Sequence, residues 1–210
     1  MMIRRILLAV ALLIPTAVAR GDYGYTALAP PGATLTYAYG INNAGHVVGD
    51  DVDAHNDNHA FTYDGSGFTS FDAYTGPNPL PYTTGFLSVN NSDQMIGFYR
   101  DGSLNNHVFF KDGASLTLLD PLNAQGLNDV GQIVGSTAGS DGLQHPFVMT
   151  GSSLIVDALP TGAVSAGYTA INNHGDVVGL FTDALGHFHG LIGIGGTVTQ
   201  FDVAGASDTQ

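Results

Sequence analysis

The sequence contains no cysteine, no tryptophan and no glutamate, and only five of its 210 residues are lysine or arginine. Without cysteine no disulfide can stabilise the chain, so the fold must depend on burial and on the pairing of strands. A chain of about 190 residues can bury enough apolar surface for that. Without tryptophan, any aromatic binding surface must be built from tyrosine and phenylalanine.

Positive charge is scarce, and the chain carries a formal net charge of −13. An electrostatic field of that sign repels phosphate backbones and anionic lipid surfaces. The charge therefore argues against nucleic acid as a partner. The same acidic surface would keep a glycine-rich β protein soluble.

Residues 1–19 have the features of a secretory signal peptide. A basic pair, Arg4-Arg5, precedes an apolar run that ends in Ala17-Val18-Ala19, a small-residue cleavage site. The run is short for a membrane span. We expect cleavage after Ala19, no membrane span afterwards, and a secreted or extracytoplasmic protein; an uncleaved N-terminal anchor is the alternative.

One frame, Asn-Asn-x-Gly-x-Val-Val-Gly, organises the rest of the sequence. Its four copies begin at Asn42, Asn90, Asn128 and Asn172. Ten positions after the closing glycine of each copy stands a histidine, in turn His59, His107, His145 and His189. The copies are spaced by 48, 38 and 44 residues, which matches the period of propeller blades.

Each repeat is predicted to form four short strands, a to d, in repeats that begin near residues 36, 84, 124 and 166. The Asn-Asn-x-Gly element between strands a and b is typical of a tight hairpin turn. Strands b and c contain consecutive apolar residues, which indicates burial on both faces and therefore stacked sheets. Each strand d ends at an aspartate: Asp72, Asp120, Asp157 and Asp202.

These features predict an all-β fold, most simply a β-propeller of four blades with four antiparallel strands each, in one domain over residues 20–210. Because both ends of the chain share one phase of the repeat, Tyr23–Leu28 is expected to pair with a C-terminal strand and close the ring. The alternative is an open or incomplete β-repeat array.

The frame, together with His59-Ala60-Phe61 and the glycine-alanine turns, resembles the HAF family of bacterial extracellular repeats. The resemblance covers nearly all of the chain after residue 19. It implies an exported, propeller-like repeat protein without a settled activity, sometimes found in PEP-CTERM proteins. The second repeat departs from the pattern with Asp93 in place of the turn glycine, and the third with Asp129 in place of the second asparagine.

Residues that recur in every repeat are expected to hold the repeat together. The four histidines would bond the nearby turn or the aspartate that ends strand d, and the four asparagines would shape the turns. Residues found in one repeat only are the candidates for function.

The loop between strands b and c of the first repeat is rich in carboxylates, with Asp50, Asp51, Asp53 and Asp57. Carboxylate oxygens suit Ca²⁺, although the loop matches no EF-hand pattern. A plain solvated loop is the alternative, and no other cofactor is expected.

The connection from strand d of the first repeat to the next strand a contains three prolines and carries Tyr74 and Tyr82. In an up-and-down sheet the b–c and d–a loops emerge at the same end, so they share one face, which we call the loop face. His55, Arg100 and His187 belong to the loop face as well. Long ordered loops on rigid scaffolds often bind ligands.

No nucleophile-elbow, zinc-protease or phosphate-loop motif is present. We therefore expect a binding or interaction module that recognises a glycan, a peptide or an envelope component through the loop face. The alternative is a hydrolase or lyase that acts on an extracellular polymer there. A cavity with two carboxylic acids of raised pKa would favour the enzyme.

Overall fold

A computed structural model describes residues 24, 26–74, 83–203 and 209, and all sixteen elements assigned in that part are strands. The strands form four units of four. Unit 1 contains β1 (Leu35–Ile41), β2 (Val47–Val52), β3 (Asn58–Tyr63) and β4 (Phe68–Phe71). Unit 2 contains β5 (Thr84–Val89), β6 (Met95–Arg100), β7 (Asn106–Asp112) and β8 (Ser115–Leu118). Unit 3 contains β9 (Asn123–Leu127), β10 (Gln132–Ala138), β11 (Gln144–Thr150) and β12 (Ser153–Val156). Unit 4 contains β13 (Ala163–Ile171), β14 (Val177–Asp183), β15 (Phe188–Ile194) and β16 (Thr197–Phe201).

The all-β prediction is confirmed, and in the described residues no helix has the length and hydropathy to cross a membrane.

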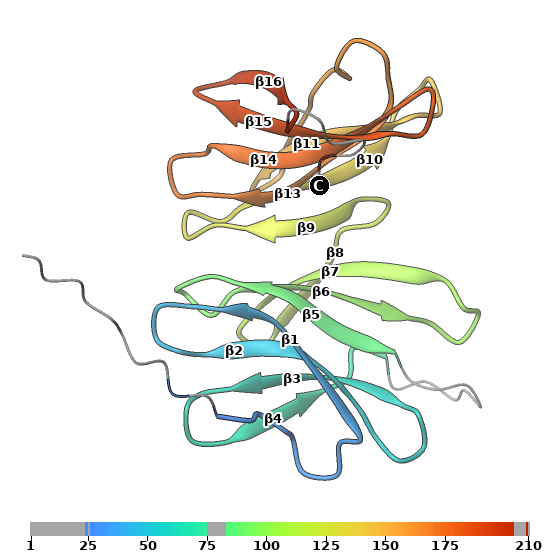
Figure 1. The fold of residues 1–210 in the computed structure, drawn as a ribbon. Coiled ribbons are helices and arrows are strands. Elements are labelled where there is room, and N and C mark those ends of the chain that lie inside the picture. The colour runs from blue at the N-terminus through green and yellow to red at the C-terminus, as the bar shows by residue number, and fades with distance from the viewer. Residues whose placement is uncertain (1–23, 25, 75–82, 204–208, 210) are drawn as a thin grey trace, which may run out of the picture.

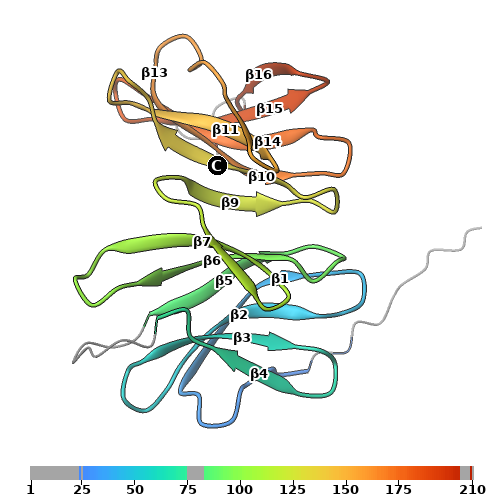
Figure 2. The ribbon, with the colours of Figure 1, turned by 180° about the vertical axis from the view of Figure 1, so that it is seen from behind.

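Within every unit, neighbouring strands in the sequence pair antiparallel, as the repeat predicted. Adjacent units touch through short parallel contacts, such as the one between Asn58 and Thr83 and the one between Gln144 and Ser165. Figure 1 shows the units following one another in chain order, and Figure 2 shows the same order from behind.

The described part of the chain forms an open array rather than a closed ring, because strands of each unit pack on strands of the next, whereas no comparable packing joins unit 1 to unit 4. The predicted closure by Tyr23–Leu28 is not found. Tyr23 and Tyr25 lie outside the described residues, Thr26–Leu28 belong to no strand, and β16 pairs only with β15 among the strands described. The shared repeat phase of the two ends could not reveal how far apart the array places them.

The turn between the first two strands of each unit is held by its leading asparagine. The Asn42 Oδ1 accepts the N–H groups of Ala44 and His46, both at 3.0 Å, and the other three asparagines repeat the pattern. The turn glycines have positive φ, and in unit 2 Asp93 takes φ 57° instead. Aspartate is one of the few residues that tolerate this backbone conformation, which explains the departure from the frame.

The closing glycine of the frame is required by a close backbone approach. The first strand of each unit contains a register shift, so that its backbone bulges toward the second strand. A Cβ atom at Gly135 would overlap the carbonyl oxygen of Asn123, and one at Gly49 would overlap that of Tyr37.

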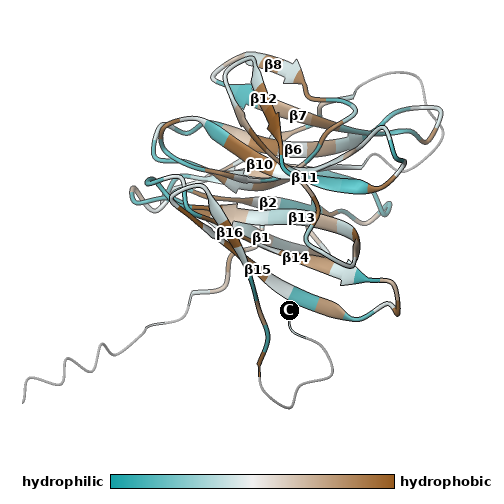
Figure 3. Ribbon diagram, turned by 90° about the horizontal axis from the view of Figure 1, so that it is seen from above, coloured by the Kyte–Doolittle hydropathy of each residue, from teal (hydrophilic) through white to brown (hydrophobic). Residues whose placement is uncertain are grey.

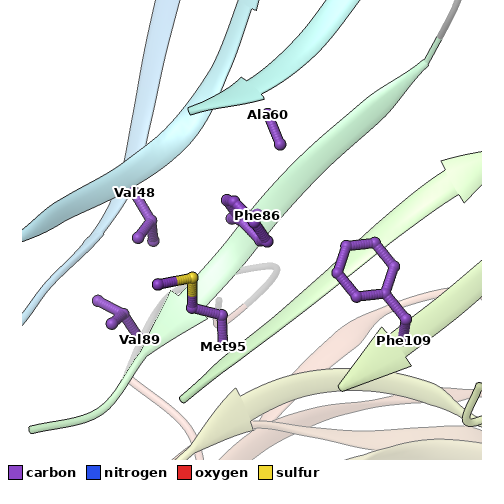
Figure 4. Packing of buried hydrophobic residues seen from close by; sticks show 6 residues of the cluster. All are labelled: Val48, Ala60, Phe86, Val89, Met95 and Phe109. Carbon is purple, nitrogen blue, oxygen red and sulfur yellow. The ribbon is translucent and has the colours of Figure 1, made fainter. Parts of the chain in front are cut away.

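Each pair of neighbouring units encloses an apolar layer. Between units 1 and 2, Val48 and Ala60 pack against Phe86, Val89 and Phe109, all of them almost fully buried (Figure 4). Figure 3 shows the matching hydropathy pattern, with hydrophobic colour along strands such as β6 and hydrophilic colour at several connections. The prediction that the sheets stack face to face is therefore confirmed.

Replacing the closing glycine should destabilise the fold. We expect Gly135→Ala to lower the free energy of unfolding by about 1–3 kcal/mol, because the methyl group must displace the backbone of β9. Gly67→Ala is the matched control, since a Cβ atom there meets nothing within 4 Å. Denaturant titration measures both, and equal stability of the two variants would contradict this account of the frame.

Candidate functional site

The b–c and d–a connections lie at the same edge of the sheets, as the alternation of strand direction predicted. Tyr74, on the connection after unit 1, stacks on Tyr99 of unit 2 with ring centroids 6.4 Å apart and an interplanar angle of 6°. At unit 1, the b–c loop residues Asp53 to His55 line one hollow together with Pro30–Gly32. The described structure thus places residues of these connections at units 1 and 2.

Each recurring histidine sits between two aspartates on this face. In three units its Nδ1 lies against the aspartate that follows the fourth strand: His59 against Asp72 at 2.8 Å, His189 against Asp202 at 2.9 Å, and His107 against Asp120. In unit 3 the Asp157 carboxylate instead accepts the Tyr168 hydroxyl at 2.7 Å, and His145 meets the Asp157 carbonyl oxygen. These contacts are those expected of residues that tie the last strand to the sheet.

A second aspartate, from the b–c loop, faces the other ring nitrogen of each histidine. The distances from Nε2 to the carboxylate are 4.0 Å for Asp53, 3.2 Å for Asp101, 3.0 Å for Asp141 and 3.6 Å for Asp183. Sequence reasoning missed this partner. The aspartate stands six positions before the histidine in three units, and that spacing was the available signal.

The aspartate–histidine pairs shift one another's pKa values. Hydrogen bonds from its ring to the Asp120 and Asp101 carboxylates raise the pKa of His107. The hydrogen bond from the His55 side chain, with those from the Asp57 and His55 backbone, lowers the pKa of Asp53 to about 2. Both directions favour the charged pair.

The residue paired with the recurring histidine varies among the units. In units 2 and 4 an aromatic ring stacks on that histidine, Tyr99 on His107 with centroids 4.8 Å apart and Phe181 on His189 at 4.5 Å. Asp51 holds the corresponding position of unit 1, paired in register with His59, and Thr137 holds it in unit 3, paired with His145. At unit 1 a hollow of about 490 Å³ opens beside Asp51. Its lining includes Pro30, Pro31, Asp51, His55, Phe68 and Asp72.

The Asp51 carboxylate is the unusual group of this hollow. The residue is 6% exposed, and burial raises its pKa. Among the described residues, the buried side-chain oxygen without a hydrogen-bond partner is Oδ1 of Asp50, whereas the Asp51 carboxylate lines the hollow and reaches its open space. A carboxylate placed in this way can accept hydrogen bonds from a ligand.

The four aspartates predicted to bind Ca²⁺ do not converge. Successive residues of a strand point to opposite faces, so Asp51 faces the hollow while Asp50 is buried on the other side, near Asn58 and Gly85. The described residues that could hold a metal are Asp53, Asp57 and His59, whose ligand atoms lie within 4.8 Å of one another. Two carboxylates with an imidazole suit a transition metal better than Ca²⁺.

The five residues predicted to bind a ligand are dispersed. His55 lines the hollow, whereas Tyr74 and Arg100 lie at unit 2, with Arg100 Nε donating to Asn106 Oδ1 at 3.1 Å. His187 pairs with Asp183 in unit 4 at 3.3 Å, and Tyr82 lies outside the described residues. Phe68, Ser70 and Asp72 of the hollow were not predicted as ligand-binding residues, because it is the pairing of β4 with β3 that brings them to the hollow beside the b–c loop.

The histidine clusters should make stability depend on pH. A histidine whose pKa is raised in the folded state stabilises the fold below its unfolded pKa of about 6.5, and this contribution is lost as pH rises through the folded pKa. His107→Gln should therefore make the fall in stability above pH 6.5 shallower, by at most about 1.4 kcal/mol per pH unit. Urea titrations at several pH values test this, and an unchanged pH dependence would contradict the assignment.

No family model and no curated protein matches the chain. Similar solved structures are a mutant of the Aleuria aurantia lectin in complex with alpha-methyl-L-fucoside, with 12% identity and a TM-score of 0.45, and a fungal lectin described as a six-bladed β-propeller, with 14% identity and a TM-score of 0.45. A lectin from Burkholderia pseudomallei has 13% identity and a TM-score of 0.40. The matches cover 81%, 82% and 78% of this chain, which spans 60%, 61% and 55% of those chains.

Proposed function

We propose that the protein is an exported binding module that holds a neutral or amino sugar of an extracellular glycan in the hollow of unit 1. One observation carries the proposal: an almost buried aspartate lines a hollow at the position that an aromatic ring fills in two other units. Ligand sites commonly combine apolar walls with a few convergent polar groups, and this hollow has both.

The lining groups suit a hydroxyl-rich ring. The Asp51 carboxylate can accept hydrogen bonds from two neighbouring hydroxyl groups, and His55 can exchange a further one at the rim. Phe68 and the pair Pro30-Pro31 offer apolar surface to the C–H side of a sugar. These groups come from three segments of unit 1, all held by β-sheet or turn hydrogen bonds.

Charge narrows the class of ligand. Asp51, Asp53 and Asp72 line the hollow, and the whole chain is acidic. Sulfated and uronic-acid polymers would be repelled, whereas neutral sugars and amino sugars would not.

A hydrolase or lyase is not favoured by the described structure. Burial raises the pKa of Asp51, but hydrogen bonds lower that of Asp53, so these two do not form the pair of raised carboxylic acids that an enzyme would need. Asp50, whose pKa burial also raises, faces away from the hollow.

The test uses the residue that unit 2 carries at the same position. We expect Asp51→Tyr to fill the hollow and to abolish binding to a glycan array of neutral, amino and acidic sugars, while the thermal midpoint is kept. His187→Ala is the control, because it removes an exposed histidine of the loop face in another unit. Asp51→Asn separates the ligand classes, since a neutral sugar should be retained more weakly and an amino sugar lost. Wild-type protein that binds no sugar, or equal binding by wild type and Asp51→Tyr, would overturn the proposal.

A further inference from the structure

The contact between consecutive units is built three times in the same way. A fully buried residue of each second strand, Val48, Ile96 or Val134, is covered by the residue that ends the next unit's first strand. The matching pairs are Val48 with Val89, Ile96 with Leu127, and Val134 with Ile171.

The two ends of the array display the unmatched halves of this contact. The corresponding residue of unit 4, Val178, is 42% exposed and lines an apolar hollow of about 350 Å³ with Ile192 and Ile194. At the other end Ile41 is 69% exposed. Ala38 is exposed as well, although its counterparts in the other units, Phe86, Ala124 and Tyr168, are buried. In units 2 to 4 the first strand is instead packed on the preceding unit.

A ladder of hydrogen bonds ends at the same two places. The Asn42 side-chain amide donates to the Asn90 carbonyl oxygen at 3.1 Å, Asn90 donates to Asn128 at 3.1 Å, and Asn128 donates to Asn172 at 2.9 Å. In parallel, the N–H of Asn43 reaches the Asn91 side chain at 2.8 Å, and two further links repeat this contact along the array. Among the described residues, no following unit offers a carbonyl oxygen to the Asn172 side-chain amide. Likewise, no preceding unit donates a backbone N–H to the Asn43 side chain.

We propose that a second copy of this chain continues the array head to tail, with β1 of one copy packed on the β13–β15 surface of the other. Ile41 would cover Val178, and the Asn172 amide would meet the Asn42 carbonyl oxygen of the incoming copy. The occupant is argued from continuity, because the joint is the interface already present three times within the chain. In Figure 1 units 1 and 4 occupy opposite ends of the array, so each chain offers both halves. Such a heterologous contact can extend into rings or filaments.

One contact competes with this assembly. The Thr209 N–H donates to the Phe188 carbonyl oxygen at 2.9 Å, and its Oγ1 accepts from Val203 N at 3.2 Å, just as Thr84 Oγ1 accepts from Ala73 N at 3.3 Å in unit 2. Thr209 thus occupies the start of a fifth first strand, where Thr36 of the incoming copy would lie. Association must displace it, so Thr209→Pro, which removes the N–H donor, should shift association to lower protein concentration.

Sedimentation velocity over a range of concentrations tests the proposal. We expect the average mass of the wild type to rise with concentration, and Ile41→Asp and Val178→Asp each to remain monomeric. Mixed together, these two variants retain one intact half each and should form a heterodimer and nothing larger. Leu185→Asp, at an 81% exposed position outside both surfaces, should associate like the wild type.

Two results would overturn the proposal. The wild type could be monomeric at every concentration, or the mixed variants could fail to pair. If the wild type is monomeric while Ile41→Asp and Val178→Asp both lower its melting temperature, each chain joins its own ends instead. Circular dichroism of both aspartate variants separates loss of association from loss of folding.

Discussion

The side-chain amide of the repeated asparagine performs two tasks in this protein. Its oxygen closes the turn within one unit, and its nitrogen donates to the carbonyl oxygen of the next unit's asparagine. Each turn is therefore specified together with the position of its neighbour. The apolar layer between units, with Val48 against Val89 as its first example, lies directly beneath this link. Without disulfides, the array is held by these two layers, one polar and one apolar.

Much of the unit could be predicted from the sequence because its constraints are local. The asparagine turn, the four short strands and the contact between histidine and the following aspartate each involve short separations along the chain. The sequence shows that the closing glycine recurs in every repeat, but it does not show why glycine is required there. That reason is a bulge in the facing strand, which only the strand register shows.

The arrangement of the units could not be predicted in the same way. The repeat shows that both chain ends lie at the same position within a unit. Closure of a ring, however, depends on the rotation between neighbouring units, and no pattern of residues reveals that rotation. The prediction that the acidic loop forms a Ca²⁺ site failed for a related reason. Asp50 and Asp51 are adjacent in the sequence, but successive residues of a strand lie on opposite faces of the sheet. The hollow likewise became recognisable only when Asp51 was compared with Tyr99 and Phe181 across units. Variation at one structural position among otherwise equivalent units is thus the clearest guide to the candidate site.

The contacts that hold the array and the candidate site lie in different parts of each unit. The asparagine ladder and the apolar layer are repeated and hold the array, whereas the loop face varies and carries the candidate site. The same repetition explains the two open ends, because a contact that is formed three times within the chain leaves one half of it exposed on unit 1 and the other half exposed on unit 4. The hollow lies on the face of unit 1 that a second copy would approach, because Tyr99 and Phe109, which hold the positions of Asp51 and Phe61 in unit 2, pack against the preceding unit. The binding proposal and the assembly proposal are therefore separated by their variants, Asp51→Tyr for binding and Val178→Asp for association.

The central claim, that the asparagine amide links consecutive units, is tested most directly by hydrogen–deuterium exchange of Asn128→Asp. Aspartate keeps the oxygen that accepts the N–H groups of Val130 and Gln132 but cannot donate to the Asn172 carbonyl oxygen. The account predicts faster exchange in β13 and β14 of the next unit, with protection of the turn at Val130 and Gln132 retained. Exchange that is unchanged in unit 4, or raised only within the turn of unit 3, would contradict it.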